Sequence, residues 1–171
     1  MSSKRILLTS FSIVLSGLLS TIAFADSGQG MTWSKLSHNS TLGIDQVSCN
    51  NGAPDGCNAY RGDTSCLLSR PILCIKVDGS SRPNYTAVGS EFYDGWAGGH
   101  IATTLPVQGY VLYAPEVGDQ ICQDSFGSGW RMAEFHDSRV GGWGFRAYGN
   151  VRNDQHFWVK INDQPANCWN R

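Results

Sequence analysis

The sequence carries little charge. Only 16% of its 171 residues are Asp, Glu, Lys or Arg, and 13 basic residues stand against 14 acidic ones, for a formal net charge of -1. Beyond the N-terminal segment there is no cluster of Lys and Arg that could neutralise a run of phosphates, which argues against nucleic acid as a partner. That same region also lacks an apolar run long enough to cross a membrane.

Several catalytic and metal-binding motifs are missing as well. The sequence contains no HExxH pair, no GxSxG elbow and no CxxC pair, so it offers no recognisable zinc protease, serine hydrolase or zinc knuckle. No metal and no other cofactor is therefore expected. The composition, with 41% hydrophobic and 11% aromatic residues and 20 glycines, is typical of a compact domain.

The N-terminus has the three parts of a secretory signal peptide. Lys4 and Arg5 provide a basic start, residues 6–19 are mostly apolar, and Ala23 and Ala25 form a small-x-small cleavage signal. We expect residues 1–25 to be removed and residues 26–171 to form a single domain, secreted or periplasmic.

Six cysteines lie in the exported part, at Cys49, Cys57, Cys66, Cys74, Cys122 and Cys168. An even number in an oxidising compartment predicts three disulfides, for which 15 pairings exist. The spacing favours two local bridges among the first four and a bridge from Cys122 to Cys168, whose loop would contribute roughly 4 kcal/mol of stability. A zinc site is the alternative, but intervals of about eight residues are too long for a knuckle.

Short apolar and β-branched runs alternate with turn residues along the chain. The pattern predicts an irregular first third, strands at 72–77, 85–88, 100–104, 108–114, 141–148 and 157–161, and short helices at 119–126 and 130–137. The segment at 95–99 separates two of these strands, and its glycines permit positive φ. In the strand at 141–148 the small residues would allow something to approach closely. These elements predict an α+β fold: a small disulfide-stapled domain with short antiparallel strands, one or two short helices and long loops.

The last fifty residues resemble the C-type-lectin-like fold. The resemblance rests on Cys122, the Gly-Trp-Arg-Met-Ala-Glu string at 129–134, the Phe-Trp-Val string at 157–159, Asn162-Asp163 and the terminal Cys168. It implies a compact, two-sheet-like domain with few regular elements and long loops that present a ligand surface. It also implies that a Cys122 to Cys168 bridge ties the helix to the final strand.

The residues that bind calcium in lectins of this fold are not matched. Here Gln164-Pro165-Ala166 follows Asn162-Asp163 instead of preceding it, and its acid is missing. A calcium ion takes about 6 to 8 oxygen ligands, and this stretch supplies one certain carboxylate and two amides. Calcium-dependent sugar binding is therefore not expected.

A group of aromatic and polar residues near the C-terminus supports a binding function. Aromatic faces beside planar hydrogen-bond donors are the chemistry of sugar or protein recognition. Trp130, Phe157 and Trp158 are expected in the core, and Trp143, Arg146 and Tyr148 are expected to be exposed. We predict a non-catalytic domain that recognises a glycan or protein surface through Trp143, Arg146, Tyr148, Asn153 and His156.

The alternative is an exported, hydrolase-like enzyme that uses Glu134, His136 or Asp137. A histidine beside carboxylates could act as a general base, although on a helix neighbouring positions point to different faces. A cleft that gathers His136 with a polar group from a distant segment would favour the enzyme. A shallow surface of aromatic and Arg side chains would favour binding.

Overall fold

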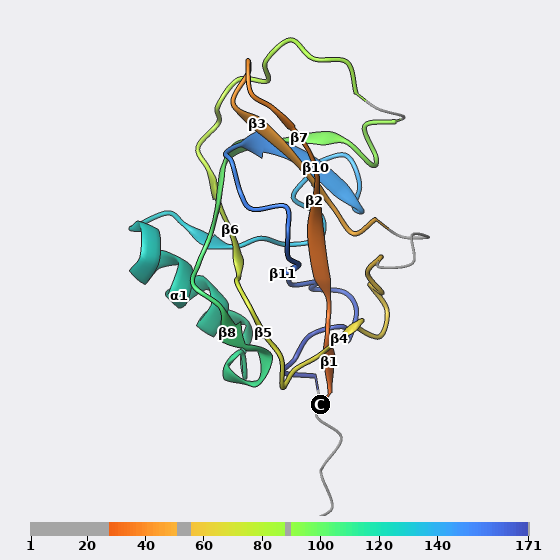
Figure 1. Ribbon diagram of the computed structural model, residues 1–171, viewed down its shortest axis with the longest axis vertical. Helices are drawn as coiled ribbons and strands as arrows, with labels where there is room; N and C mark the ends of the chain where they lie inside the picture. The colour runs from red at the N-terminus through yellow and green to blue at the C-terminus, as the bar shows by residue number, and fades with distance from the viewer. Residues whose placement is uncertain (1–27, 51–55, 88–89, 171) are drawn as a thin grey trace, which may run out of the picture.

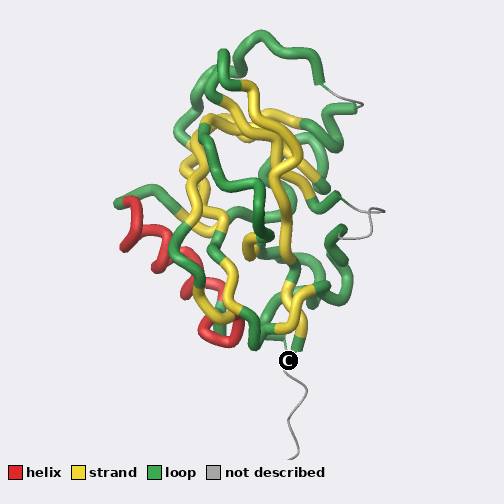
Figure 2. Tube along the Cα trace, in the orientation of Figure 1, coloured by secondary structure: helices red, strands yellow, loops and turns green. Residues whose placement is uncertain are grey.

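The computed structural model describes residues 28–50, 56–87 and 90–170, so the predicted signal peptide lies outside the described residues. Within these ranges the chain forms a seven-stranded sheet, two small two-stranded sheets and one α-helix, which lies beside the sheet (Figures 1 and 2). The main sheet has the order β11-β2-β3-β10-β7-β6-β9, and its pairs are antiparallel except for β10 with β7. A small, disulfide-stapled α+β domain with short strands is thus confirmed.

The strands of the main sheet are β2 (Thr32–Asn39), β3 (Ile44–Ser48), β6 (Leu73–Val77), β7 (Gly95–Thr103), β9 (Arg131–Met132), β10 (Gly144–Tyr148) and β11 (Phe157–Trp158). One small sheet pairs β1 (Gln29–Gly30) with β4 (Thr64–Ser65), and the other pairs β5 (Ser69–Arg70) with β8 (Val107–Gln108). None of the helices in the described ranges is long and apolar enough to cross a membrane.

The first third of the chain is more regular than expected. Strands β2 and β3 form an antiparallel hairpin, and β2 also pairs with β11 near the other end of the chain. All five residues of β3 are buried because the strand lies between β2 and β10. Ser37 and His38 of β2 are exposed, whereas Trp33 and the polar Thr32 from the same strand are fully buried.

The glycine-rich segment at 95–99, expected to separate two strands, instead forms strand β7 together with most of the strand predicted at 100–104. Gly98 has the positive φ that the glycines of this segment were expected to permit, at 76°. Gly99 pairs with Val77 of β6, and a side chain at Gly99 would place its Cβ 1.9 Å from the Lys76 carbonyl oxygen. The glycines therefore let two strands approach each other. The strand predicted at 72–77 is confirmed as β6, whereas Tyr85 to Ala87 lie outside any strand and Val88 is not described.

The helix predicted at 130–137 does not form. Arg131 and Met132 pair with β6 as strand β9, and the following backbone groups bond to Leu73 and Lys160. Because neighbouring strands take up these amide and carbonyl groups, no helical i to i-4 bonds are made. The spacing of apolar residues at 130–137 was compatible with a helix, but it arises because β6 and the segment at Lys160 pack against this stretch.

The helix predicted at 119–126 is confirmed and is longer, running over Pro115–Phe126 as α1. Proline suits the first turn of a helix, and Gly127 ends it with a φ of 96°. The strand predicted at 108–114 is mostly wrong, because only Val107–Gln108 pair and Gly109–Val111 form a 3-10 helix. The strands at 141–148 and 157–161 are present as the shorter β10 and β11.

All six cysteines form disulfides, as predicted, and none is left to bind zinc. The bridges are Cys49–Cys57, Cys66–Cys168 and Cys74–Cys122. The predicted Cys122 to Cys168 bridge is wrong, as is the expectation of a second local bridge. Helix α1 packs along β9, next to β6, and this brings Cys122 to Cys74 instead of to the C-terminus.

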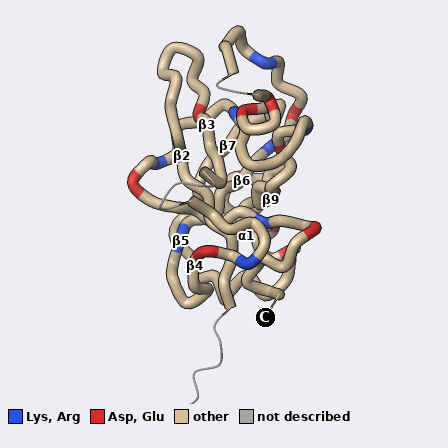
Figure 3. The backbone as a smooth tube through the Cα atoms, turned by 90° about the vertical axis from the view of Figure 1, so that its right-hand side faces the viewer, with Lys and Arg blue, Asp and Glu red and all other residues tan. Residues whose placement is uncertain are grey.

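The buried side chains form two clusters. One contains Trp33, Phe145 and Phe157, which come from strands of the main sheet. The other contains Leu112, Met132 and Trp158 together with the cysteines of two disulfides. Phe157 and Trp158 are each 1% exposed, as expected, while Trp130 is partly buried against the second cluster. Few charges interrupt this scaffold, and Figure 3 shows Lys and Arg scattered among Asp and Glu along the chain.

Candidate functional site

Four loop and turn segments enclose a hollow of about 230 Å³ beside the main sheet. Its lining includes the rings of Tyr60, Phe92, Phe135 and Trp143, which come from positions far apart in the sequence. It consists of Ala59, Tyr60, Phe92, Phe135, His136, Gly141, Gly142, Trp143, Ile161, Asp163 and Gln164. A larger hollow of about 480 Å³ near Lys35 and Arg152 has a mostly polar lining that contains no Phe, Tyr or Trp.

The aromatic rings meet at steep angles. The ring centroids of Phe135 and Trp143 are 5.1 Å apart with an angle of 74° between the planes, and those of Tyr60 and Trp143 are 6.3 Å apart at 58°. Phe135 also packs edge-on against the buried Trp33, which fixes that side to the core. The rings therefore form the walls of a concave site and not a single flat platform.

Trp143 adopts a backbone conformation that is unusual for a large residue. Its φ is 71°, in the left-handed region, which costs roughly 1–2 kcal/mol for a residue with a side chain. The conformation is held by hydrogen bonds to the Trp143 carbonyl from the Cys49 amide at 2.8 Å and the Ser48 hydroxyl at 2.7 Å. Strain of this kind concentrates at functional sites, where the surrounding structure maintains it.

Glycines on either side of Trp143 explain the alternation of small and large residues. A Cβ on Gly142 would lie 2.0 Å from the Phe135 ring, and one on Gly144 would lie 2.3 Å from the Tyr93 carbonyl oxygen. A close approach at these small residues was predicted, and the groups that approach are the Phe135 ring and the Tyr93 backbone carbonyl.

The variant Gly142→Ala should displace the Phe135 ring from the wall of the hollow. Such overpacking costs about 1–3 kcal/mol, which urea unfolding would detect as a lower midpoint. Gly43→Ala measures the cost of backbone strain by itself, because φ is 66° there and a Cβ meets nothing within 4 Å, whereas Gly142 does not have a positive φ. An unchanged urea midpoint for Gly142→Ala would contradict the close contact with Phe135.

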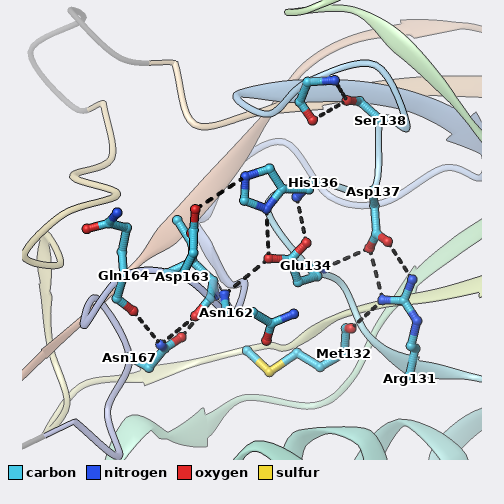
Figure 4. Close-up of polar contacts among 12 residues, drawn as sticks. Arg131, Met132, Glu134, His136, Asp137, Ser138, Asn162, Asp163, Gln164 and Asn167 are labelled. Atoms are coloured by element: carbon cyan, nitrogen blue, oxygen red, sulfur yellow. Dashed lines mark hydrogen bonds and ion pairs between the residues drawn. The ribbon is translucent and has the colours of Figure 1, made fainter.

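His136 lines the hollow and lies between the carboxylates of Glu134 and Asp163 (Figure 4). Its Nδ1 lies 3.1 Å from Oε1 of Glu134, and its Nε2 lies 3.8 Å from Oδ2 of Asp163. Glu134 is 8% exposed and also accepts hydrogen bonds from the backbone amides of His136 at 2.7 Å and Asn162 at 3.2 Å. A turn instead of a helix at this point allows residues two apart to face each other.

Asp137 does not take part in this arrangement. Its carboxylate forms a bidentate ion pair with Arg131 and accepts a hydrogen bond from the Glu134 amide (Figure 4). Burial lowers the pKa of Arg131, but the hydrogen bond and charge of Asp137 outweigh it and leave that pKa raised. Arg131 therefore stays charged, and its two hydrogen bonds to Asp137 stabilise the turn that carries His136.

Acidic groups dominate the charge of the hollow. Its described lining includes Asp163, which is well exposed, and contains no Lys or Arg, and the carboxylate of Glu134 lies behind His136. The nearby Arg139 points elsewhere, since a Cβ on Gly98 would meet its guanidinium at 2.8 Å. Across residues 28–50, 56–87 and 90–170, no three His, Cys, Asp or Glu side chains are placed to hold a metal ion.

Arg146, predicted to be exposed, is buried at 7% exposure. Its Nε donates to Asp94 at 2.6 Å, its Nη2 donates to Gln46 at 3.1 Å, and its guanidinium lies 4.9 Å from the centre of the Tyr85 ring. The residue has this position because β10 runs between β3 and β7. Arg146 therefore stabilises the sheet and is not available to a ligand.

The other predicted binding residues do not gather at one place. Tyr148 is half-buried against Trp96, with ring centroids 5.1 Å apart. Asn153 is exposed beside the larger polar hollow, and Nδ1 of His156 lies 3.2 Å from the Thr32 hydroxyl. Among the five predicted residues, Trp143 is the one in the described lining of the aromatic hollow.

Sequence reasoning missed several residues of the hollow. Tyr60 lies in a polar, glycine-rich segment, and the sequence around Phe92 gave no pattern that linked it to Trp143. Asp163 and Gln164 drew attention only as a weak match to a calcium-binding string. A signal was present at Trp143 itself, where a large aromatic between glycines often marks a tight backbone.

Comparisons of the chain with protein-family models, with curated proteins and with solved structures gave no match.

Proposed function

We propose that this protein is an exported, non-catalytic binding domain that holds one group of a glycan or protein ligand in the aromatic hollow. The observation that carries the proposal is the concave wall of Tyr60, Phe135 and Trp143, with Asp163 and Gln164 at its polar side. Ligand sites are typically concave and mostly apolar, with a few placed polar groups. The strained backbone of Trp143 adds support, because the fold maintains that residue at a cost.

The size of the hollow suits a small part of a larger ligand. Its volume of about 230 Å³ is below the range of about 300–1,000 Å³ of sites that enclose drug-sized molecules. A single sugar ring, head group or side chain is the expected occupant. Tyr93 and Val140, each next in sequence to a lining residue, are exposed and provide further apolar surface for the rest of the ligand.

The resemblance to the C-type-lectin-like fold remains part of this proposal. Long loops that present a ligand surface are what the resemblance implies, and loops and turns supply most of the hollow. The Cys122 to Cys168 bridge that it also implied is absent, so the resemblance does not extend to the disulfides.

Glycan-array binding by the oxidised protein, with and without a chelator, tests the function. We expect binding that a chelator leaves unchanged and that Trp143→Ala reduces at least tenfold. Tyr148→Ala is the matched control, since it removes an aromatic ring outside the hollow and should leave binding unchanged. Normal binding by a folded Trp143→Ala variant would show that the hollow is not the binding site. Intact disulfides together with circular dichroism establish that the variant is folded.

A second candidate is the hydrolase-like enzyme. The structure places His136 in the hollow with Asp163 and Gln164 from a distant segment, and Glu134 orients its ring, as a general base requires. Asp137 is held by Arg131 and would only support the turn. Turnover of a glycoside or ester substrate that His136→Ala abolishes, while Trp143-dependent binding persists, would favour the enzyme over the binding domain.

A further inference from the structure

We propose that the group held in the aromatic hollow is a methylated ammonium cation. This inference rests on the proposed binding function and names the chemical class of the ligand. Aromatic rings attract cations through the negative charge of their faces, and quaternary ammonium groups are recognised by cages of such rings. Three observations favour this class over a neutral sugar.

The first observation is the arrangement of the rings. The ring centroids of Tyr60 and Phe135 lie 6.3 Å and 5.1 Å from that of Trp143, and the planes are tilted by 58° and 74°. Phe135 is only 5% exposed, so Tyr60 and Trp143 are the rings that meet a ligand directly. Because their centroids are 6.3 Å apart, one cation can lie within about 6 Å of both, the range over which a ring attracts a cation. A neutral sugar instead stacks best on one exposed, flat face, which steeply inclined walls do not offer.

The second observation is charge. Asp163 lines the hollow, Glu134 lies behind His136, and the described lining contains neither Lys nor Arg. The oxygens of Glu134 are occupied by His136 and Asn162, whereas Asp163 is 60% exposed and has His136 at 3.8 Å as its ion-pair partner. Asp163 is therefore the carboxylate that faces an incoming cation.

The third observation is the small number of hydrogen-bond acceptors. A primary ammonium carries three N–H donors that need partners when they leave water. The carboxylate of Asp163 and the amide of Gln164 provide acceptors on one side of the hollow, and the aromatic rings provide none on the other. A methylated ammonium has no such donors or fewer of them, and its methyl groups contact ring faces. The hollow thus fits the methylated form better than a lysine side chain.

Calorimetric titration of the oxidised protein with choline and with its neutral isostere 3,3-dimethyl-1-butanol tests the inference. The two probes have the same shape and differ in charge, so we expect choline to bind at least tenfold more tightly. Phosphocholine and trimethyllysine amide then distinguish a head-group source from a protein source. Whichever of these two binds more tightly identifies the source of the ligand. Both are expected to bind more tightly than the same compounds without the methyl groups on nitrogen.

Two variants separate the contribution of charge to choline binding from the contribution of the aromatic rings. Asp163→Asn should weaken choline binding at least fivefold and leave the isostere unaffected, while Asp124→Asn, an exposed change on α1, should alter neither. Trp143→Phe keeps an aromatic ring but should weaken choline binding, because a Trp ring attracts cations more strongly than a Phe ring. Trp143→Ala should remove binding of both probes.

The outcomes distinguish this inference from the proposed function. Equal affinity for choline and its isostere, both lost in Trp143→Ala, would overturn the inference that the ligand is a cation. The same result would support the aromatic hollow as the binding site. A glycan that binds in a Trp143-dependent way while choline does not bind would do the same. Absence of binding for every probe and for the glycan array would overturn both.

Discussion

Removing the Cys66–Cys168 bridge by a double change to alanine should lower the free energy of unfolding by about 4–5 kcal/mol. The two cysteines are 102 residues apart, and cross-linking so long a loop removes a large amount of conformational entropy from the unfolded chain. The bridge also ties β4 to the last turn of the chain, within the cluster around Trp158. Urea unfolding of the oxidised proteins gives the measurement.

The Cys49–Cys57 bridge provides an internal comparison. Its partners are only 8 residues apart, so its removal should cost about 2.6 kcal/mol, roughly half as much. Cys74–Cys122, with a separation of 48, should fall between the two. Equal losses for all three double variants would show that local packing, and not loop closure, determines what each disulfide contributes.

Arg146→Ala should destabilise the protein by about 3–5 kcal/mol, because it removes one partner of a buried ion pair. The Arg146 and Asp94 side chains are 8% and 0% exposed, and their hydrogen bond measures 2.6 Å. The change also takes away the cation next to the Tyr85 ring and the donor to Gln46. The expected loss would be seen as a lower urea midpoint with an unchanged slope.

An exposed ion pair of the same type is the control. Arg152 and Asp154 have side chains that are 70% and 56% exposed, so water already solvates both charges. Arg152→Ala should therefore leave stability unchanged within error. A small effect of Arg146→Ala, comparable with that of Arg152→Ala, would contradict the structural role assigned to the buried pair.

The predictable parts of this fold are those that depend on local sequence. Strand β6 is apolar and β-branched and is followed by Asp78-Gly79, and helix α1 begins at Pro115 and ends before Gly127. An even number of cysteines in a chain predicted to be exported implied three disulfides, and that number is correct. Each of these signals is contained within a few residues or in the composition.

The wrong expectations share a cause in long-range packing. Residues 130–137 have helical periodicity, but Met132 and Glu134 face partners on β6 and at Lys160 that no local pattern reveals. Cysteine pairing likewise depends on where α1 packs. Arg146 looked like a surface residue because charged side chains usually are, and its partner Asp94 is 52 positions away.

The site shows the same limit. Trp143 was predicted as a binding residue, but Tyr60 and Asp163 reach it from segments about eighty residues before it and twenty after it in the sequence. The Glu134 and His136 pair was considered on a helix, where the two would diverge. A turn fixed by Asp137 and Arg131 brings them together instead.

Ligand titration followed by nitrogen-proton NMR of the oxidised protein tests the central claim most directly. With choline or a glycan identified on the array, we predict shift changes confined to the amides around Tyr60, residues 135–143 and Asp163, and to the Trp143 indole. Shift changes centred on Trp96 and Tyr148, or on the hollow near Lys35, would contradict the assignment of the site to the aromatic hollow.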